Sequence, residues 1–172
     1  STPDQRRSAL VLTARAAALI APSEDHAGEA DRLIASMLSA GFDEQAVRWA
    51  SIVDGGSLGW GLLACAAPGW RGAISEGELD DFRGNDDSAD YRKSKFLLAG
   101  LAGLGRAEAA AITDFSETLE VNVRKESRWS RAIAAAAQRG ESGTVVLLAA
   151  SALQGTGWQD IPLSSVSDTL HL

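Results

Sequence analysis

AGFDEQA, residues 40–46, stands between two apolar helical runs, and a related turn, AGLGRAEA, returns at residues 102–109. In each turn a glycine that can end a helix in the left-handed conformation, Gly41 or Gly103, is followed by a large apolar residue. Helix-forming residues resume within a few positions, which is how two antiparallel helices are joined. The two turns predict an all-α fold built as a stack of antiparallel helical hairpins.

The composition of the chain agrees with a helical fold. It has 172 residues, is 45% hydrophobic and is rich in alanine, the residue with the highest helix propensity. A chain of this length can bury a core without a metal or a disulfide, and its single cysteine, Cys65, has no partner in the chain. The sequence begins at Ser1 without a methionine and stops at Leu172 within an amphipathic pattern. We therefore expect a single helical repeat domain over residues 1–172 that is a fragment of a longer chain.

Apolar residues recur at spacings of three and four over a series of segments that end at Gly, Pro or a polar turn. Asp43 and Ser57 stand where a helix needs an N-cap, since their side chains can accept from the first free amides. Asp114 and Glu117 have the spacing of a capping box, which predicts another helix start. The predicted helices cover residues 4–20, 28–40, 43–53, 58–67, 88–104, 107–112, a segment from 114, 125–139, 144–153 and a last helix from 162.

Residues 69–90 lack clear apolar periodicity and form a long acidic connection between two helical halves, with one short helix expected around 78–82. Arg83 is the one base between residues 76 and 90, so this stretch carries most of the net charge of −7. Its seven acids are Glu76, Glu78, Asp80, Asp81, Asp86, Asp87 and Asp90. Their spacing does not fit a calcium loop. A solvated loop with helix-capping acids is the favoured interpretation, and Asp86 and Asp87 stay candidate binding residues.

The five tryptophans divide into two groups by their neighbours. Trp49, Trp60 and Trp129 fall within helical segments beside apolar residues and are expected to fill the core between alanine-rich helices. Trp70 and Trp158 each follow a glycine at a predicted helix end. They either lock the turn by hydrophobic packing or offer an exposed stacking surface for a peptide or a sugar, so both are candidate binding residues.

Arg128 and Arg131 flank Trp129 in a basic segment, a combination that nucleic-acid surfaces also use. The patch is small and the molecule is negatively charged, which opposes phosphate binding, so no nucleic-acid partner is expected. A surface helix with its tryptophan turned inward is the favoured interpretation, and the two arginines are retained as candidate binding residues. Salt-sensitive retention of oligonucleotides that Arg128→Ala and Arg131→Ala weaken would support the nucleic-acid alternative.

The stretch from Leu38 to Ala50 resembles the central turn of a tetratricopeptide-type helical hairpin, in which a glycine, an acidic turn residue and a following alanine sit at similar spacing. The resemblance covers about a quarter of the chain. It implies a superhelical stack of helix pairs with irregular repeats. It implies no activity, because such repeats are usually scaffolds.

A second resemblance concerns ESRW, residues 126–129, which looks like the catalytic Glu-Ser-x-aromatic motif of lytic transglycosylases. GWQDIP, residues 157–162, is similar to a later element of the same family. The resemblance implies Glu126 as a general acid with a raised pKa. The neighbouring Arg124, Lys125 and Arg128 would instead lower that pKa.

The favoured function is a non-catalytic scaffold that holds a protein partner, because the chain shows no convergent set of acid, base and nucleophile. The alternative is a peptidoglycan-cleaving or glycan-binding module. No catalytic residue, metal site or cofactor is assigned, since His26 and His171 are far apart and lack other ligands at suitable spacing. No apolar stretch is long enough to span a bilayer, so we expect a soluble chain, cytoplasmic or periplasmic.

Overall fold

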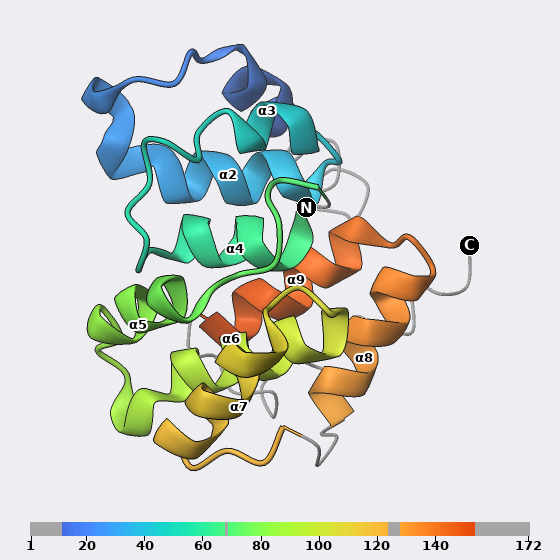
Figure 1. Ribbon diagram of the computed structural model, residues 1–172. Coiled ribbons are helices and arrows are strands. Elements are labelled where there is room, and N and C mark those ends of the chain that lie inside the picture. Colours follow the sequence, from blue (N-terminus) through green and yellow to red (C-terminus); the bar gives the residue numbers. More distant parts are fainter. Residues whose placement is uncertain (1–11, 68, 124–127, 154–172) are drawn as a thin grey trace.

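The computed structural model describes residues 12–67, 69–123 and 128–153 (Figure 1). These residues form helices joined by turns, and they contain no strand, only an isolated bridge between Ile74 and Ala107. The all-α prediction is confirmed. After helical residues 12–19, the elements are η1 (Glu24–Glu29), α2 (Ala30–Ser39), α3 (Asp43–Val47), α4 (Leu58–Ala66), α5 (Glu76–Gly84), η2 (Ala89–Tyr91), α6 (Arg92–Leu104), α7 (Ala109–Thr118), α8 (Arg128–Gln138) and α9 (Ser142–Leu153).

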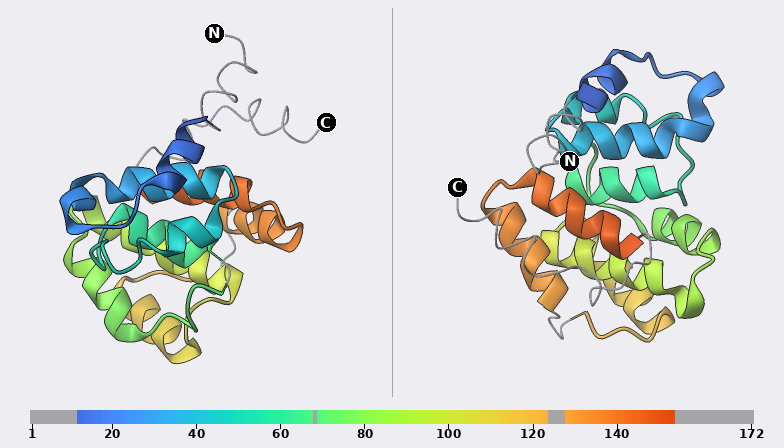
Figure 2. Two further views of the ribbon diagram at one scale, coloured as in Figure 1. Left: turned by 90° about the horizontal axis from the view of Figure 1, so that it is seen from above. Right: turned by 180° about the vertical axis from the view of Figure 1, so that it is seen from behind.

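The last described helix, α9, lies in the middle of the molecule. It packs against α2 and α4 on one side and against α6 and α8 on the other, and Figure 2 shows it crossing the centre of the molecule in the view from behind. Val145, Val146, Leu148 and Ala149 of α9 are buried there. In a linear repeat array each unit contacts only its neighbours in sequence, so α9 joins helices that a simple array would keep apart.

Glycines in the left-handed conformation end α2, α6 and α8, at Gly41, Gly105 and Gly140. At each end the same pair of backbone bonds forms, as at α2, where Phe42 N donates to Met37 O (2.9 Å) and Gly41 N donates to Leu38 O (3.2 Å). This is the Schellman motif, which supplies partners to the last carbonyl groups of a helix.

The prediction that Gly103 ends the helix at the second turn was wrong. Gly103 lies inside α6, and Gly105, with φ of +64°, takes the left-handed conformation instead. Arg106 N then donates to Leu101 O (2.9 Å). The residue that follows this helix-ending glycine is therefore an arginine and not the apolar Leu104.

Two contacts hold the beginning of α4. The Ser57 hydroxyl accepts from Trp60 N (3.1 Å), which confirms the predicted N-cap. Asp31 of α2 adds a second cap, because its Oδ1 accepts from Gly59 N (2.8 Å). A carboxylate is favourable at a helix N-terminus, so α2 and α4 are joined by a polar contact as well as by apolar packing.

The short helix predicted at residues 78–82 is present but longer, because it forms α5 over nine residues. Ser75 and Glu78 make the capping box that begins it, with Ser75 N donating to Glu78 Oε2 (3.0 Å). Leu79 and Phe82 point into the core. The acidic connection is thus partly a core helix whose outer face carries the charge.

Two predicted helix starts were wrong. Asp43 does not cap α3, because Phe42 holds the N-cap position and Asp43 is already the first helical residue. Its Oδ1 is buried without a hydrogen-bond partner among the described residues, and burial raises the pKa of Asp43. Asp114 lies inside α7, which has already begun at Ala109.

The helix predicted over residues 43–53 ends at Val47. Beyond it the backbone winds more tightly, with Trp49 N bonded to Ala46 O and Ala50 N bonded to Val47 O. Trp49 is 1% exposed. The core tryptophan prediction is confirmed, since Trp60 and Trp129 are buried too, and Trp129 Nε1 donates to Leu148 O (3.0 Å).

Candidate binding pocket

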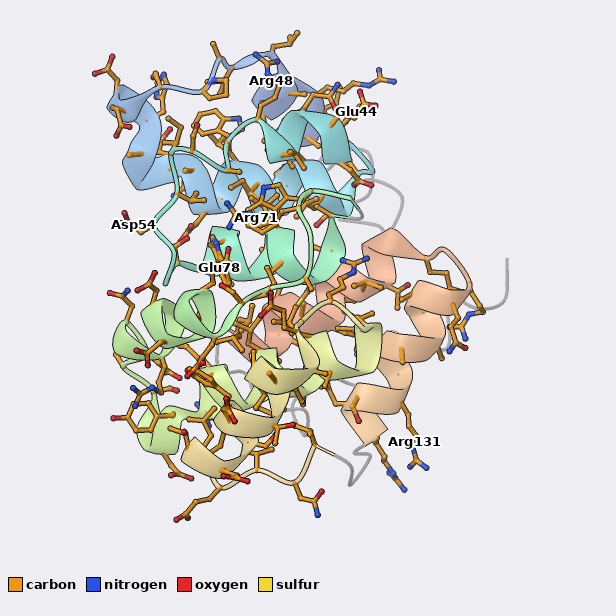
Figure 3. The ribbon with its side chains drawn as sticks, in the orientation of Figure 1. Glu44, Arg48, Asp54, Arg71, Glu78 and Arg131 are labelled. Atoms are coloured by element: carbon orange, nitrogen blue, oxygen red, sulfur yellow. The ribbon has the colours of Figure 1, made fainter. Side chains whose placement is uncertain are left out.

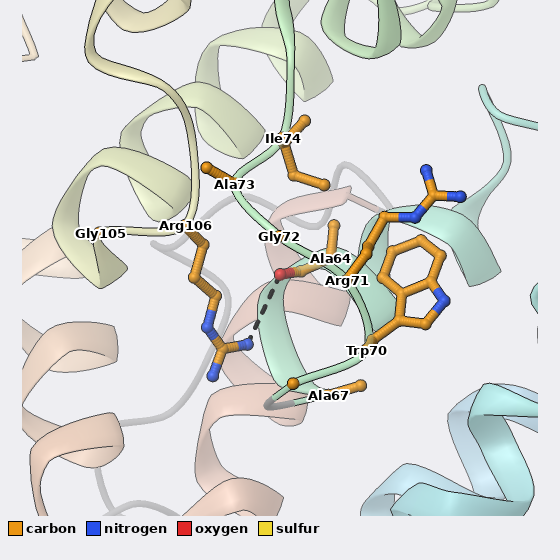
Figure 4. Close-up of a pocket in the computed structure, with 10 residues that line it drawn as sticks. Ala64, Ala67, Trp70, Arg71, Gly72, Ala73, Ile74, Gly105 and Arg106 are labelled. Carbon is orange, nitrogen blue, oxygen red and sulfur yellow. Dashed lines mark hydrogen bonds between the residues drawn. The ribbon is translucent and has the colours of Figure 1, made fainter.

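A pocket of about 250 Å³ lies where the end of α4, the segment after it and the turn between α6 and α7 come together (Figure 4). Its lining combines small apolar residues, three glycines, one tryptophan and two arginines. The lining residues are Ala64, Ala67, Gly69, Trp70, Arg71, Gly72, Ala73, Ile74, Gly105 and Arg106.

Backbone pairing fixes the two segments that form the pocket. Ile74 N donates to Arg106 O (2.8 Å), and Glu108 N donates to Ile74 O (2.9 Å). Ile74 is also buried against the core. The connection after α4 is therefore held against the α6–α7 turn, about thirty residues further along the chain.

Arg106 reaches from this turn to the C-terminal end of α4. Its Nη1 donates to the carbonyl oxygens of Cys65 and, at 3.5 Å, of Ala64. A positive charge is favourable at a helix C-terminus, where the carbonyl groups lack partners within the helix. Arg106 therefore joins the turn between α6 and α7 to the end of α4.

The guanidinium of Arg106 is half-buried and has no carboxylate partner among the described residues. The Nε and Nη2 atoms of Arg106 donate no hydrogen bond to any other described residue. Burial lowers the pKa of Arg106, yet arginine stays protonated at neutral pH. The pocket thus contains a cation with unused donors.

Trp70 and Arg71 lie on the other side of the same segment from Arg106 in Figure 4. Trp70 is half-buried and meets Trp60 edge to face, with ring centroids 6.1 Å apart. The guanidinium carbon of Arg71 stands 4.7 Å from the centroid of the Trp70 ring, a cation–π contact. Trp70 therefore packs the turn and also lines the pocket.

Arg71 is paired with Glu78, and Figure 3 shows the two side chains pointing toward one another between α4 and α5. Burial alone would raise the pKa of Glu78, but hydrogen bonds from Ser75 and the charge of Arg71 lower it overall. Arg71 is thus already neutralised within the chain, whereas Arg106 is not.

The backbone of the segment also has unused donors. The amides of Arg71, Gly72 and Ala73 donate no hydrogen bond to the described residues. Gly69, which precedes them, has φ of +73°, a conformation that residues with a side chain rarely adopt. The segment therefore exposes three consecutive amides beside the pocket.

Cys65 contributes its carbonyl to Arg106 but not its thiol to the pocket. The thiol is buried, and burial raises its pKa to about 12 despite the opposing charge of Arg106. The thiolate is the reactive form of cysteine, so Cys65 is not a nucleophile in the folded protein.

The structure separates the residues that the sequence proposed for binding. Trp70 lines the pocket. Asp86 accepts hydrogen bonds from Ser88 and Ser94, and the exposed Asp87 pairs with Lys93. Burial alone would raise the pKa of Asp86, but the bonds from the two serines lower it.

Arg128 and Arg131 are exposed on α8, far from the labelled Arg71 in Figure 3, where Arg131 extends into solvent. Arg131 borders a separate shallow hollow of about 460 Å³ between α6 and α8. Trp158 and Glu126 lie outside the described residues, and so do the motifs of residues 124–127 and 157–162.

Arg71 and Arg106 were not singled out from the sequence. For Arg106 a signal exists, since an arginine directly after a helix-ending glycine can turn back toward a neighbouring helix. The sequence did not reveal this signal, because Gly103 and Gly105 are equally able to end α6. For Arg71 the adjacent Trp70 was the signal, because arginine stacks well on tryptophan.

The chain matches no protein-family model, and no curated protein or solved structure is significantly similar to it. Within residues 12–67, 69–123 and 128–153, no helix combines the length and the apolar character that crossing a bilayer requires. Over the same ranges, no three His, Cys, Asp or Glu side chains gather in a way that could hold a metal ion.

Proposed function

We propose that this protein is a non-catalytic helical scaffold that binds a protein partner through the pocket between α4 and the α6–α7 turn. The observation that carries the proposal is the half-buried Arg106, whose charge has no carboxylate partner among the described residues. Arginine and aromatic residues often contribute most to protein interfaces, and Trp70 lines this pocket together with Arg106.

The chemistry of the lining supports binding over catalysis. Both arginines stay protonated at neutral pH and so do not exchange protons with a substrate there. The remaining lining residues are apolar or glycine, apart from the indole N–H of Trp70. Such a set can hold a ligand by charge, hydrogen bonds and packing.

The proposal includes the architecture of antiparallel helical hairpins. The pairs α2–α3, α6–α7 and α8–α9 pack on each other across turns that contain a left-handed glycine, which supports the hairpin as the building unit. α9 packs on both α4 and α6, the two helices that lead into the segments lining the pocket.

The experiment that tests this function is site-specific photo-crosslinking in cells that express the intact protein. A benzophenone amino acid replaces Ala73 at the pocket in one sample and Ala89 of η2, also exposed, in the control. We expect a discrete protein adduct at Ala73 that is absent at Ala89. The adduct partner, once purified, should bind the intact protein, and Trp70→Ala should weaken that binding at least tenfold.

Equal adducts at both positions, or full binding by the Trp70→Ala variant, would contradict the proposal. So would turnover of a small molecule by the purified protein with no protein bound at Ala73. Thermal unfolding of the Trp70→Ala variant shows whether it remains folded, because Trp70 also packs on Trp60.

A further inference from the structure

We infer that the helix of residues 12–19 in one copy of this protein docks into a groove over α6 in a second copy, so that copies associate head to tail. An exposed apolar helix face lies at one end of the molecule, and a groove of matching size and charge lies at the other. The inference goes beyond the proposed function, because the groove shares no lining residue with the pocket between α4 and the α6–α7 turn.

The helix of residues 12–19 has apolar residues on both of its faces. Ala14 and Ala17 are buried on its inner face. On its outer face Leu12 and Leu19 are 66% and 87% exposed, and the exposed Ala16 lies between them. These three residues stand at positions i, i+4 and i+7, the spacing at which an amphipathic helix places its anchors in an apolar groove. The described residues therefore leave a docking face uncovered.

The surface over α6 is hollowed between α7 and α8, which both pack against α6. The hollow of about 460 Å³ beside α8 and another of about 700 Å³ beside α7 have Ala102 and Val123 in common. The two hollows therefore form one continuous groove, called here the α6 groove. Ile112, Val121 and Val123 are half-buried on its α7 side and make that part apolar.

The α6 groove matches a short helix in length. Its walls are formed by residues between 109 and 117 on α7 and between 130 and 138 on α8. At 1.5 Å per residue each wall is roughly 13 Å long, and the helix of residues 12–19 is roughly 12 Å long. The floor consists of Ala99, Ala102 and Gly103, whose small side chains leave room for a helix to approach α6.

The charges of the two surfaces are complementary. Arg15 is exposed at the edge of the outer face of the helix, and Glu117 and Glu120 are exposed on the α7 side of the groove. None of these three forms an ion pair within the described part of the chain. Arg131 lies on the α8 side and would repel Arg15. The charges therefore favour the orientation in which Arg15 faces α7.

The two surfaces lie too far apart to meet within one copy. In Figure 1 the helix of residues 12–19, in dark blue, is at the top of the molecule and α7 is at the bottom. The view from behind in Figure 2 shows the same separation. Docking therefore joins two copies through two different surfaces, an arrangement that produces a ring or an open chain of copies.

Sedimentation velocity of the intact purified protein over a hundredfold range of concentration tests the inference. A single short helix forms a small and therefore weak interface, so we expect the sedimentation coefficient to rise at the high end of the range. Leu19→Asp places a charge on the outer face and should weaken association at least tenfold. Leu147→Asp, at an exposed leucine of α9, is the matched control and should leave association unchanged.

A second pair of variants tests the groove. Thr113→Trp fills the α6 groove from an exposed position on α7 and should also weaken association at least tenfold. Thr118→Trp adds the same side chain at an exposed position of α7 outside the groove lining and should have no effect. Far-ultraviolet circular dichroism and thermal unfolding of each variant show whether it is folded.

Mixing the two disabled variants gives the most specific test of a head-to-tail contact. The Leu19→Asp variant keeps an intact groove, and the Thr113→Trp variant keeps an intact helix. Each should be monomeric alone, and together they should form a one-to-one dimer that grows no further. A contact between identical surfaces would not produce this result.

A charge exchange tests the role of Arg15. Arg15→Glu should weaken association about twofold to fivefold, the effect expected of an exposed ion pair. Replacing Glu117 and Glu120 by lysine in the same chain should restore association, because the exchanged charges again attract. Failure of this restoration would show that Arg15 does not face α7.

A wild-type protein that stays monomeric at the highest concentration would overturn the inference, as it would if another segment of the same chain covered the outer face. Unchanged association of the folded Leu19→Asp variant, or a mixture of the two disabled variants that stays monomeric, would also overturn it. These results leave the proposed function standing if a partner still crosslinks at Ala73, because that position lies outside the groove.

Discussion

Arg106 shows how a single backbone conformation places a charged side chain. Gly105 turns the chain at the end of α6, and the next residue faces the last carbonyls of α4. The side chain binds those carbonyls with one nitrogen, Nη1, and lines the pocket. At the residue scale, the position of one glycine decides what the candidate site contains.

Asp86 is a second residue whose environment sets its role. One carboxylate oxygen accepts from the amide (2.9 Å) and hydroxyl (2.5 Å) of Ser88, and the other accepts from those of Ser94 (2.8 and 2.6 Å). The connection between α5 and α6 is thereby tied to the first turns of α6. Asp86 therefore supports the fold and is not free to bind a partner.

Asp86→Asn should reduce the free energy of unfolding at pH 7 by about 2 kcal/mol, since charged hydrogen bonds are lost. The pKa of Asp86 is lowered from its ordinary value of 3.8, so its stabilising effect is present above that pH. The effect is lost as the pH falls through the lower pKa of the folded state. Urea unfolding at several pH values should show the gap between wild type and variant closing below about pH 4.

Asp114→Asn is the matched control, because Asp114 is exposed on α7. It should leave the free energy of unfolding at pH 7 close to that of the wild type. A difference at Asp86 that stays constant down to pH 2 would show that the carboxylate charge is not what matters there.

Gly100 is required by a close approach of two helices. A Cβ added at Gly100 of α6 would stand 2.9 Å from Cη2 of Trp129, whose rigid ring is buried and bonded to Leu148. Gly100→Ala should reduce the free energy of unfolding by about 1–3 kcal/mol through overpacking, measured by chemical denaturation.

Gly103→Ala, three residues later in α6, provides the comparison. A Cβ there would meet only the Ser130 carbonyl oxygen at an ordinary 3.7 Å. Alanine should therefore stabilise the helix by about 0.5–1 kcal/mol. Equal effects at the two glycines would mean that contact with Trp129 does not restrict α6.

At the scale of single elements, the ends of the helices are as informative as their lengths. The Schellman motif that ends α2, α6 and α8 also ends α7, where Val121 N donates to Ser116 O (2.9 Å). At α7 the left-handed position is held by Glu120, with φ of +53°. A residue with a Cβ is strained in that conformation.

Glu120→Gly should raise the free energy of unfolding by about 0.5–1 kcal/mol, because the relief of strain exceeds the entropy that glycine loses on folding. Thermal or urea unfolding measures the change. Glu117→Gly, within α7, should have the opposite sign, since glycine in a helix interior is unfavourable. A destabilised Glu120→Gly variant would show that the glutamate side chain contributes more than its backbone strain costs.

At the scale of the whole molecule, we expect α9 to make the fold cooperative. It contacts helices from both halves of the chain, α2 and α4 as well as α6 and α8. Loosening α9 should therefore loosen α2, although more than a hundred residues separate them in sequence. A strictly linear array would confine the effect to the neighbouring helix.

Leu148→Ala, at a position that is 2% exposed, should cost about 2–5 kcal/mol, and hydrogen exchange should accelerate in α2 as well as in α9. Leu147, the adjacent residue, is 54% exposed, and Leu147→Ala should change stability by at most about 0.5 kcal/mol. Faster exchange confined to α8 and α9 would contradict a shared core.

Local signals predicted the helical class and many helix positions. The segments around α2, α4 and α6 follow from apolar spacing, and Ser57 and Gly41 mark their ends by properties of single residues. Errors arose where two neighbours could do the same task, as with Gly103 and Gly105 or Phe42 and Asp43. There the choice depends on which alternative lets a whole helix pack, and the local sequence does not contain that information.

The sequence by itself determined that this chain is helical, where most of its turns fall and that Trp49, Trp60 and Trp129 are buried. These follow from propensity, capping and periodicity, which act over a few residues. Only the tertiary structure decided that α9 lies at the centre and that Arg106 meets the end of α4 in the pocket that Trp70 also lines. Such contacts join segments tens of residues apart, and they form because each helix buries its apolar face against whichever partner the complete set of helices leaves available.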